Sequence, residues 1–372
     1  MLNAECSMLN AECSMPNAEC PLPNAQDPMA KEGAEALARS GMRRRLHRLV
    51  LVVLTLVLVL SWAGGDHHVA GQSAACDRDC LTAIVDSYLA ALVAHDPSKA
   101  PLARGLRFTE NTGLLDAGEG LWVGASEAPT GFKIYVPDPA TGQVGFIGVM
   151  KEFDKPVQVA LRLRVLNRRI LEAEHVVARS LNAAGLKNLA VPRAAFAADV
   201  AASQRIARAE MLRIADSYYD SLSKGIGALT PYADDCVRHE NGMQTSTNRT
   251  PQPPPPGVTP GQASAFATLG ALGCAAQMDT QMFSYITSID LRRVQIVDEQ
   301  KGLVFGLTMF RHLGRLRTIA LTGVPGLASM PMNFGPIDLQ AAHIFKIAGG
   351  KLHEIEAMGY TLPYKSSSGW ER

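Results

Sequence analysis

Three consecutive residues in the second part of the chain have types that suit proton transfer. His239, Glu240 and Asn241 lie in a stretch with the alternating pattern of a strand. Because side chains on a strand point alternately to its two faces, His239 and Asn241 share one face and Glu240 takes the other. An imidazole that faces a cavity acts as a general acid or base near neutral pH. The alternative is structural, with His239 hydrogen-bonded in the scaffold and Glu240 capping a neighbouring element.

Two further carboxylates with a regular spacing lie near the end of the chain. Glu354 and Glu356 are two residues apart, so they project from the same face of a predicted strand at residues 351–360. Two carboxylates on one face can raise the pKa of one of them and form an acid/base couple. Alternation between an exposed face and a core face explains the same spacing more simply.

Three other residues suit a polar site in the same region. His343 lies within an apolar segment, where it is either a buried structural group or a second imidazole beside His239. Arg311 ends another such segment and can orient an anionic group, although exposed charges are common at strand ends. Tyr218, on a predicted helix, either donates a hydrogen bond into a pocket or packs in the core. The candidate catalytic residues are therefore His239, His343 and Glu356, and the candidate substrate-binding residues are Tyr218, Glu240, Asn241 and Arg311.

The elements that must position these residues occur twice. The letters Asp-Ser-Tyr at 86–88 and Glu-Asn at 110–111 return at 216–218 and 240–241, an offset of 130 residues in both cases (216 − 86 and 240 − 110). The Glu-x-Glu pattern at 172–174 returns at 354–356, an offset of 182 (354 − 172). The second copy therefore contains an insertion of about 50 residues (182 − 130).

The two copies differ where the chemistry is expected. The first copy has Thr109 at the position of His239, and it has Leu161 at the position of His343 (343 − 182). We therefore expect the second copy to carry a polar pocket with imidazoles and the first copy to be a supporting one.

Hydrophobic periodicity predicts the elements of each copy. Apolar residues at spacings of three and four predict amphipathic helices at 80–94 and 207–223. Two-residue turns at 167–168 and 349–350 join the last two strands of each copy. The predicted strands are at 106–111, 133–136, 144–152, 157–165 and 169–178, and at 236–243, 288–298, 303–311, 317–322, 341–347 and 351–360. The fold class is α+β, in which a curved antiparallel sheet wraps around a helix.

The first 75 residues have the composition of a leader. The chain begins with four imperfect heptapeptides whose prolines exclude a coiled coil. Four arginines between residues 43 and 48 then precede an apolar run at 49–63 and a series of small residues, the pattern of a secretory signal peptide. We expect a periplasmic or secreted protein with a low-complexity segment at 1–41, a signal peptide at 42–75, a first module at 76–180, a linker at 181–206 and a second module at 207–365 with a proline-rich insertion near 248–262.

Four cysteines follow the predicted signal peptide: Cys76, Cys80, Cys236 and Cys274. An even number in an oxidising compartment favours disulfides, and four cysteines allow three pairings. Sequence proximity favours Cys76 with Cys80 and Cys236 with Cys274. Free buried thiols and a zinc site are the alternatives, although no second pair of close ligands completes a tetrahedral site.

The composition limits the classes of partner. A formal net charge of +1 and 6% aromatic residues give no reason to expect nucleic acid. No phosphate-binding glycine loop, nucleophile elbow or metalloprotease motif is present, so no metal and no organic cofactor is expected. A membrane contact is expected only through an uncleaved signal segment. A small-molecule ligand is the partner that remains.

The repeated helix, the short strand that ends in Glu-Asn and the final hairpin resemble the SnoaL-like branch of the nuclear-transport-factor-2-like superfamily. The resemblance rests on residues 86–88 with 109–111, residues 216–218 with 239–241, Gly145-Phe146, and the hairpin at 342–360. It covers residues 78–179 and 208–365. More narrowly, the chain resembles uncharacterised exported bacterial and fungal proteins with tandem domains of unknown function.

This resemblance implies two tandem cone-shaped modules, each with a mostly apolar pocket between the concave sheet and its helices. The superfamily includes isomerases, dehydratases, polyketide cyclases, lyases and non-catalytic binding modules, so the fold does not name a reaction. We expect the second module to bind a small hydrophobic, oxygenated molecule and to carry out cofactor-free isomerisation, dehydration or lyase chemistry on it. The alternatives are a non-catalytic ligand-binding or interaction module, and an intramolecular pseudo-dimer that serves stability.

Overall fold

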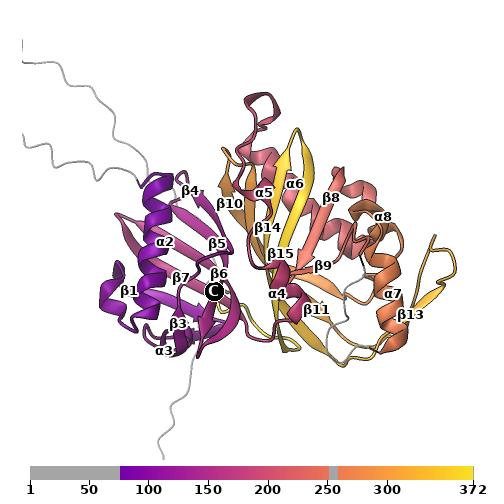
Figure 1. The fold of residues 1–372 in the computed structure, drawn as a ribbon, viewed down its shortest axis with the longest axis horizontal. Helices are drawn as coiled ribbons and strands as arrows, with labels where there is room; N and C mark the ends of the chain where they lie inside the picture. The colour runs from indigo at the N-terminus through magenta and orange to yellow at the C-terminus, as the bar shows by residue number, and fades with distance from the viewer. Residues whose placement is uncertain (1–75, 251–258, 372) are drawn as a thin grey trace, which may run out of the picture. The chain divides into compact units, whose positions relative to one another are not determined.

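The computed structural model describes residues 76–250 and 259–371, which form an α+β structure with two large sheets (Figure 1). The expected low-complexity segment at 1–41, the signal peptide at 42–75 and residues 251–258 of the insertion lie outside the described residues. No helix within the described ranges is long and apolar enough to cross a membrane.

The first half of the described chain (residues 76–178) packs one long helix on a sheet. Helix α2 (Arg78–Val93) begins after Asp77, whose side chain accepts a hydrogen bond from the Cys80 amide and so satisfies one free N–H of the first turn. Its buried face, with Leu81 and Val85, contacts the sheet (Figure 1). The other elements of this half are β1 (Leu102–Glu110), β2 (Gly113–Leu115), α3 (Leu121–Gly124), β3 (Ala125–Glu127), β4 (Lys133–Asp138), β5 (Gln143–Glu152), β6 (Lys155–Leu166) and β7 (Arg169–Ala178).

The second half (residues 208–371) repeats this layout. Helix α6 (Arg208–Lys224) ends at Gly225, which adopts the left-handed conformation (φ 62°) that glycine accepts without strain. The remaining elements are β8 (Tyr232–Glu240), β9 (Met243–Gln244), α7 (Pro260–Gly270), α8 (Cys274–Asp279), β10 (Ser288–Asp298), β11 (Leu303–His312), β12 (Thr318–Ala320), β13 (Ser329–Pro331), β14 (Ile337–Ala348) and β15 (Lys351–Pro363).

The two large sheets have corresponding strand orders. The first runs β2-β1-β7-β6-β5, with β3 and β4 both paired to β5, and the second runs β9-β8-β15-β14-β11-β10. Each contains one parallel pair, β1 with β7 and β8 with β15, so the sheets are mixed, whereas we expected antiparallel ones. Thr109 lies opposite Glu174 in the first parallel pair, and His239 lies opposite Glu356 in the second. This register agrees with the sequence offsets of 130 and 182.

A connector (residues 179–207) joins the two halves. It contains the short helices α4 (Ala183–Asn188) and α5 (Ala194–Ala197). The apolar cluster that includes Leu189 and Phe196 of the connector also contains side chains from both sheets, such as Ile147 and Phe305. The two sheets therefore share a core on the faces that do not contact α2 and α6.

Buried ion pairs and the end of the chain strengthen this shared core. Arg208 of α6 donates to Asp138 of β4, and Arg293 of β10 donates to Glu174 of β7. Near the C-terminus, the indole nitrogen of Trp370 donates to the hydroxyl of Thr109 over 2.9 Å. The guanidinium groups of Arg107 and Arg162 lie 4.4 and 4.5 Å from the centre of the Trp370 ring, the geometry of a cation–π contact.

Helices α7 and α8 occupy the insertion of the second half, where the sequence predicted only a proline-rich loop (Figure 1). The signal for α7 is present in the sequence. Thr259 and Gln262 form a capping box, and Pro260 occupies the first turn of the helix. The alanine, serine and glycine content of the helix gives little amphipathic pattern, which is why the periodicity did not predict it.

Two disulfides are present, and they are the two pairs that sequence proximity favours. Cys76 is bonded to Cys80 at the start of α2, and Cys236 of β8 is bonded to Cys274 of α8. The second bond joins two cysteines that are 38 residues apart in sequence, one in the sheet and one in the insertion. It therefore attaches the insertion to the sheet. The positions of α8 and β8 relative to each other are thus covalently restrained.

Candidate functional site

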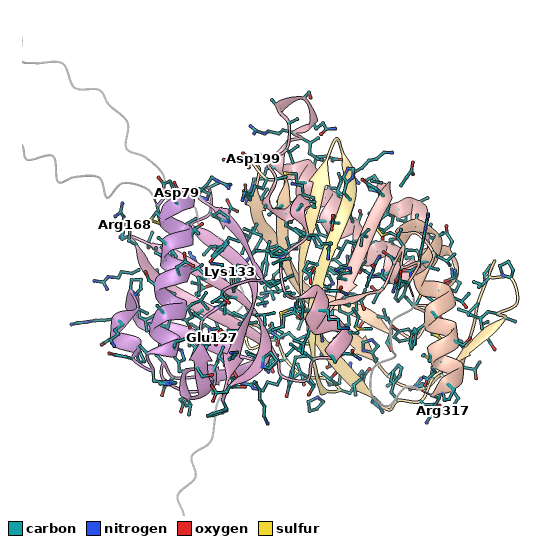
Figure 2. The ribbon with its side chains drawn as sticks, viewed as in Figure 1. Asp79, Glu127, Lys133, Arg168, Asp199 and Arg317 are labelled. Atoms are coloured by element: carbon teal, nitrogen blue, oxygen red, sulfur yellow. A yellow bond between two sulfur atoms is a disulfide. The ribbon has the colours of Figure 1, made fainter. Side chains whose placement is uncertain are left out.

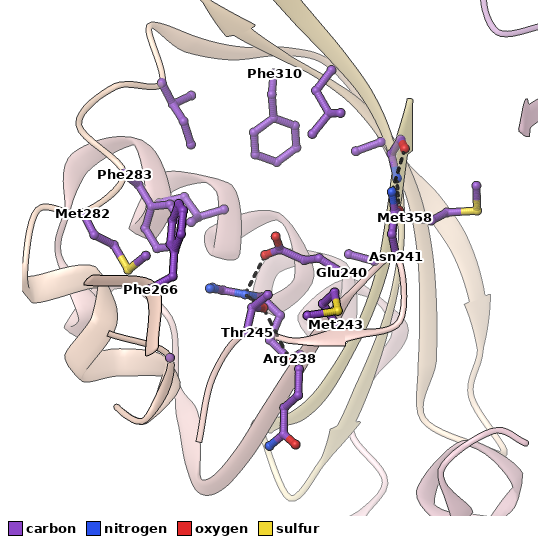
Figure 3. A pocket seen from close by; sticks show the side chains of 18 of the residues that line it. Arg238, Glu240, Asn241, Met243, Thr245, Phe266, Met282, Phe283, Phe310 and Met358 are labelled. Carbon is purple, nitrogen blue, oxygen red and sulfur yellow. Dashed lines mark hydrogen bonds and ion pairs between the residues drawn. The ribbon is translucent and has the colours of Figure 1, made fainter. Parts of the chain in front are cut away.

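A cavity of about 700 Å³ lies in the second half, between the second sheet, α6 and helix α7 of the insertion (Figure 3). Its volume is in the range of sites that enclose a small organic ligand. Most of its lining is apolar or aromatic. The largest apolar or aromatic side chains that line it are Tyr218, Phe266, Phe283, Tyr285, Phe310, Met243 and Met282.

The sheet contributes its side chains to the cavity with the period of two that a strand imposes. Phe310 and His312 come from β11, and Leu339, Ala341 and His343 come from β14. Arg238 and Glu240 come from β8, and Ala357 and Gly359 come from β15. The cavity therefore lies on one face of the sheet.

A buried cation, Arg238, lines the cavity, although it was not among the residues predicted from the sequence. Its side chain is only 1% exposed. Its Nε lies 2.8 Å from Glu240 Oε1 and donates to the hydroxyl of Thr245 over 3.0 Å. Its Nη2 donates to Gln277 over 2.7 Å. Figure 3 shows the guanidinium group beside the carboxylate of Glu240.

The helix α8 orients this guanidinium group. The amide nitrogen of Gln277 donates to the backbone carbonyls of Thr245 and Leu269 over 2.5 and 2.7 Å, so its amide oxygen must face Arg238. The disulfide between Cys236 and Cys274 holds α8 against the strand that carries Arg238. The insertion therefore supplies both a wall of the cavity and the partner that orients its cation.

One donor of Arg238 has no acceptor. Within residues 76–250 and 259–371, Nη1 of this buried guanidinium has no hydrogen-bond partner. A buried, charged donor without an acceptor costs free energy, which an oxygen atom at that position would recover. Because arginine stays protonated at all pH values that proteins experience, this preference does not depend on pH. The cavity thus combines an apolar body with one point that favours an oxygen atom.

His343 lines the cavity among aromatic rings. Its imidazole stacks on Phe345 and Phe310, with ring centres 5.6 and 5.8 Å apart, and lies 5.6 Å from the ring of Tyr218. Burial, with a smaller effect from Arg238, lowers the pKa of His343 to about 3. The imidazole is therefore neutral at physiological pH, and its Nδ1 has no partner among the described residues.

A second imidazole, which was not among our candidates, also reaches the cavity. His312 is 6% exposed and stacks on Tyr285 with ring centres 5.6 Å apart. Burial lowers the pKa of His312 below its usual value. Its neighbour Arg311, a candidate binding residue, points away from the cavity and donates to Asp290 and Asp338. Because alternation places adjacent strand residues on opposite faces, only one of Arg311 and His312 can face the cavity, and the sequence alone did not show which one.

The structure does not bring His239 and His343 together. His239 and Glu356 lie on the opposite face of the sheet from the cavity, where both contact Arg193 of the connector. Nδ1 of His239 is 3.9 Å from Glu356. The expected arrangement, with both imidazoles on one concave face, is therefore wrong. The reason is that alternation placed His239 correctly relative to Glu240 but could not identify the face that encloses the cavity.

Asn241 borders the cavity, but its amide is committed to the scaffold. It donates to the carbonyl of Gly359 and accepts from the amide of the same residue, over 3.1 and 2.8 Å. Asn111 makes the same two bonds, over the same distances, with Val177 in the first half. Both asparagines are left-handed, with φ of 46° and 47°, a conformation that asparagine tolerates. The repeated Glu-Asn letters thus mark a structural turn.

The corresponding space in the first half contains packed side chains. By register, Phe108 takes the place of Arg238, and His175 takes the place of Ala357. His175 is fully buried, accepts or donates at Nε2 to the hydroxyl of Tyr88 over 2.9 Å, and lies 3.5 Å from Glu110. The sequence comparison missed this imidazole because it lies one strand away from the position of His343.

We predict that Ala357→His narrows the cavity of the second half. The substitution introduces the first half's residue at the same register, and a side chain there points into the space that a ligand would fill. Binding of an aromatic ligand is expected to fall by about tenfold or more through steric exclusion. Isothermal titration calorimetry measures this. Ala320→His, at an exposed position on β12, is the control, and equal affinities for both variants would contradict the prediction.

The described residues offer no evident site for a metal ion. In these ranges, no group of three or more His, Cys, Asp or Glu side chains is arranged to hold one. The titratable side chains in the cavity lining are Arg238, Glu240, His312, His343, Tyr218 and Tyr285. Of these, burial raises the pKa of the Tyr218 phenol, which keeps it protonated as a hydrogen-bond donor.

One family model matches part of the chain. Residues 204–359 match a family described as a domain of unknown function (DUF8021), a range that includes the strands and helices around the cavity. No curated protein matches the chain in sequence.

Several solved structures resemble part of the chain. A putative polyketide cyclase from Xanthomonas campestris pv. campestris is 14% identical, with 41% of this chain and 90% of that chain covered and a TM-score of 0.24. AclR, a putative hydroxylase from Streptomyces galilaeus, is 10% identical, with coverages of 41% and 80% and a TM-score of 0.23. An NTF-2 like protein of unknown function from Burkholderia xenovorans LB400 is 12% identical, with coverages of 44% and 96% and a TM-score of 0.24. At these values, none of the three says what this chain does.

Proposed function

We propose that the second half binds a small, largely hydrophobic molecule that carries an oxygen acceptor. The observation that supports this most directly is the buried guanidinium of Arg238, which lines an apolar cavity and whose Nη1 has no hydrogen-bond partner among the described residues. Glu240 neutralises part of its charge, so a neutral ligand with a carbonyl or hydroxyl oxygen fits as well as an anion. The aromatic and methionine side chains around it suit a flat apolar body.

Cofactor-free acid/base chemistry is a second candidate function, with isomerisation, dehydration or a lyase step as the reaction. His343 supports it, because its neutral imidazole faces the same cavity as Arg238 and Tyr218. An imidazole with a pKa of about 3 is a weak base, however, so binding without catalysis agrees better with the environment of His343. His239 and Glu356, the other candidates for catalysis, do not line the cavity.

We further propose that the protein is exported and that its halves are tandem copies of one module. The two disulfides support export, because such bonds persist in oxidising compartments. The corresponding strand orders and the shared register support duplication. The core shared by the two sheets supports an intramolecular pseudo-dimer.

The binding proposal predicts that 2-naphthol, a flat apolar molecule with one hydroxyl, binds the purified chain at one site. Calorimetric titration at pH 8 gives the affinity and the stoichiometry. A chain that binds neither 2-naphthol nor naphthalene would contradict the proposal. Incubation with a metabolite extract, followed by mass spectrometry of bound and released compounds, tests the catalytic candidate. Turnover that His343→Ala leaves at full rate would exclude His343 from that chemistry.

A further inference from the structure

The cavity of the second half is not built by the second half alone. Ser180, Leu181 and Asn182, which follow directly after β7 of the first half, form part of its lining. The side chain of Asn182 also accepts from the amide of Ala184 and so caps helix α4 of the connector. One part of the cavity wall therefore depends on where the connector lies.

Helix α4 contacts the turn between β8 and β9. The side chain of Asn188 donates to the carbonyl of Gly242 over 2.8 Å. The backbones of Gly185 and Gly242 approach so closely that a Cβ on Gly242 would lie 2.4 Å from the carbonyl oxygen of Gly185. This turn follows Glu240 and contains Asn241, and both residues line the cavity. The connector is thus in direct contact with the strand end that carries the polar groups.

Arg193 attaches a further part of the connector to the sheet, and Lys346 of β14 also donates to the connector at the Ala198 carbonyl. Its guanidinium donates to Glu354, to Nδ1 of His239, to Glu356 over 2.8 Å and to the carbonyl of Ile355 over 3.1 Å. These acceptors lie on β8 and β15, on the face opposite the cavity. Two of the three candidates for catalysis, His239 and Glu356, therefore bind this arginine.

We propose that Arg193 is a positioning residue that holds the connector as one wall of the cavity, so that the ligand affinity of the second half depends on a segment that follows the first half. This inference rests on the proposed function, because it concerns the same cavity. It assigns His239, Glu354 and Glu356 a role that does not require contact with the ligand.

The charges around Arg193 make the contact sensitive to pH. Burial raises the pKa of Glu356 to about 7, against the opposing effect of Arg193. The other groups nearby are Glu354 on the same strand, His239 on β8 and Lys346 on β14, opposite Glu354. Burial and Arg193 lower the pKa of His239 to about 3, so it stays neutral. As the pH falls through 7, Glu356 takes up a proton and its ion pair with Arg193 is lost.

A change in pH affects the stability of the fold and the ion pair between Glu356 and Arg193 in opposite directions. A folded carboxyl whose pKa is raised to about 7 binds more protons than the unfolded one between its usual pKa and that value. The stability that this group contributes therefore falls as the pH rises through 7, while the ion pair with Arg193 forms. A weaker affinity for ligand at low pH would thus not reflect acid unfolding caused by Glu356.

The test uses the full chain with 2-naphthol as probe and Arg193→Met, Arg193→Lys, Glu356→Gln and Arg168→Met as variants. Arg168 is an exposed arginine in the turn between β6 and β7 and serves as the matched control (Figure 2). We expect Arg193→Met to weaken binding by about tenfold, the loss of one or two charge-assisted hydrogen bonds, and Arg193→Lys to restore part of it. Arg168→Met should bind like the wild type.

Two further measurements separate positioning from a general structural role. Wild-type affinity should fall severalfold between pH 8 and pH 5.5, and Glu356→Gln should remove this dependence, because glutamine does not titrate. In hydrogen exchange without ligand, Arg193→Met should increase uptake across residues 180–193 and leave α6 unchanged.

The outcomes distinguish this inference from the proposed function. If the wild type binds the probe but Arg193→Met binds it equally well, or the Glu356→Gln profile follows the wild type, the positioning role is excluded and the binding proposal stands. Unchanged exchange across residues 180–193 also excludes it, whether or not any variant binds. If the wild type fails to bind at pH 8, the proposed function fails and this inference with it.

Discussion

Replacing Arg238 by methionine is expected to weaken the binding of 2-naphthol by about 10- to 150-fold, the equivalent of one hydrogen bond to a charged group. The affinity for naphthalene should change little. Methionine replaces the apolar stem of arginine but lacks the guanidinium group, and so removes the donor Nη1, which has no partner within the described residues. The difference between the two ligands isolates the oxygen contact from the apolar contacts that both share. Calorimetric titration of both ligands against both proteins gives the four affinities.

A matched control and a stability measurement accompany this experiment. Arg168→Met removes an exposed arginine that lies away from the cavity, so it should leave all affinities unchanged. Thermal unfolding reports whether Arg238→Met is folded, which we expect because Glu240, its ionic partner, is about half-exposed and can be solvated. Equal losses of affinity for 2-naphthol and naphthalene would show that Arg238 shapes the cavity and does not recognise oxygen.

Replacing His175 by alanine in the first half is expected to lower the free energy of unfolding by about 4 kcal/mol, because a cavity forms and buried polar groups lose a partner. His175 is fully buried between Tyr88, with which it shares a hydrogen bond of 2.9 Å, and Phe108, whose ring centre is 4.7 Å away. Although burial acts in the other direction, His175 and then Arg179 lower the pKa of Glu110 to about 2. The truncation removes the larger of these two partners from a mostly buried carboxylate. Urea unfolding followed by circular dichroism measures the effect.

His353→Ala provides the comparison for this prediction. His353 is a partly exposed imidazole that contacts an exposed carboxylate, Asp235, so its loss should cost less than about 1 kcal/mol. Similar costs for the two variants would mean that the cluster around His175 is not a rigid part of the core. Ligand binding in the second half should survive His175→Ala, because no residue of the first half lines its cavity.

The sequence predicted most of the fold because the elements follow simple periodicities. The predicted helix at 207–223 is α6 (Arg208–Lys224), and the predicted strand at 288–298 is β10 (Ser288–Asp298). The turns at Asn167-Arg168 and Gly349-Gly350 all have positive φ, as a tight hairpin requires. The two disulfides have the pairing that proximity favoured.

The site was harder to predict because both faces of the second sheet are buried. Usually an exposed face and a buried face distinguish the two sets of alternating residues. Here the connector covers the face that carries Glu356, which is only 1% exposed. The residue types on the two faces therefore did not show which face encloses the cavity. Four of the candidate residues line the cavity: Tyr218, Glu240, Asn241 and His343. The other three do not: His239, Glu356 and Arg311. Arg238 could have been predicted from the sequence, because alternation places it on the same face of the strand as Glu240.

The contact between Trp370 and Thr109 has a consequence for the order in which parts of the protein fold. The indole and the hydroxyl that it contacts are 261 residues apart in sequence, so Trp370 is synthesised well after Thr109. During translation from the N-terminus, the first sheet exists before the ring that covers Arg107 and Arg162. The surroundings of Thr109, Arg107 and Arg162 are therefore completed only after residue 370 has been synthesised. A nascent chain that stops before residue 370 leaves those two arginines without their aromatic partner.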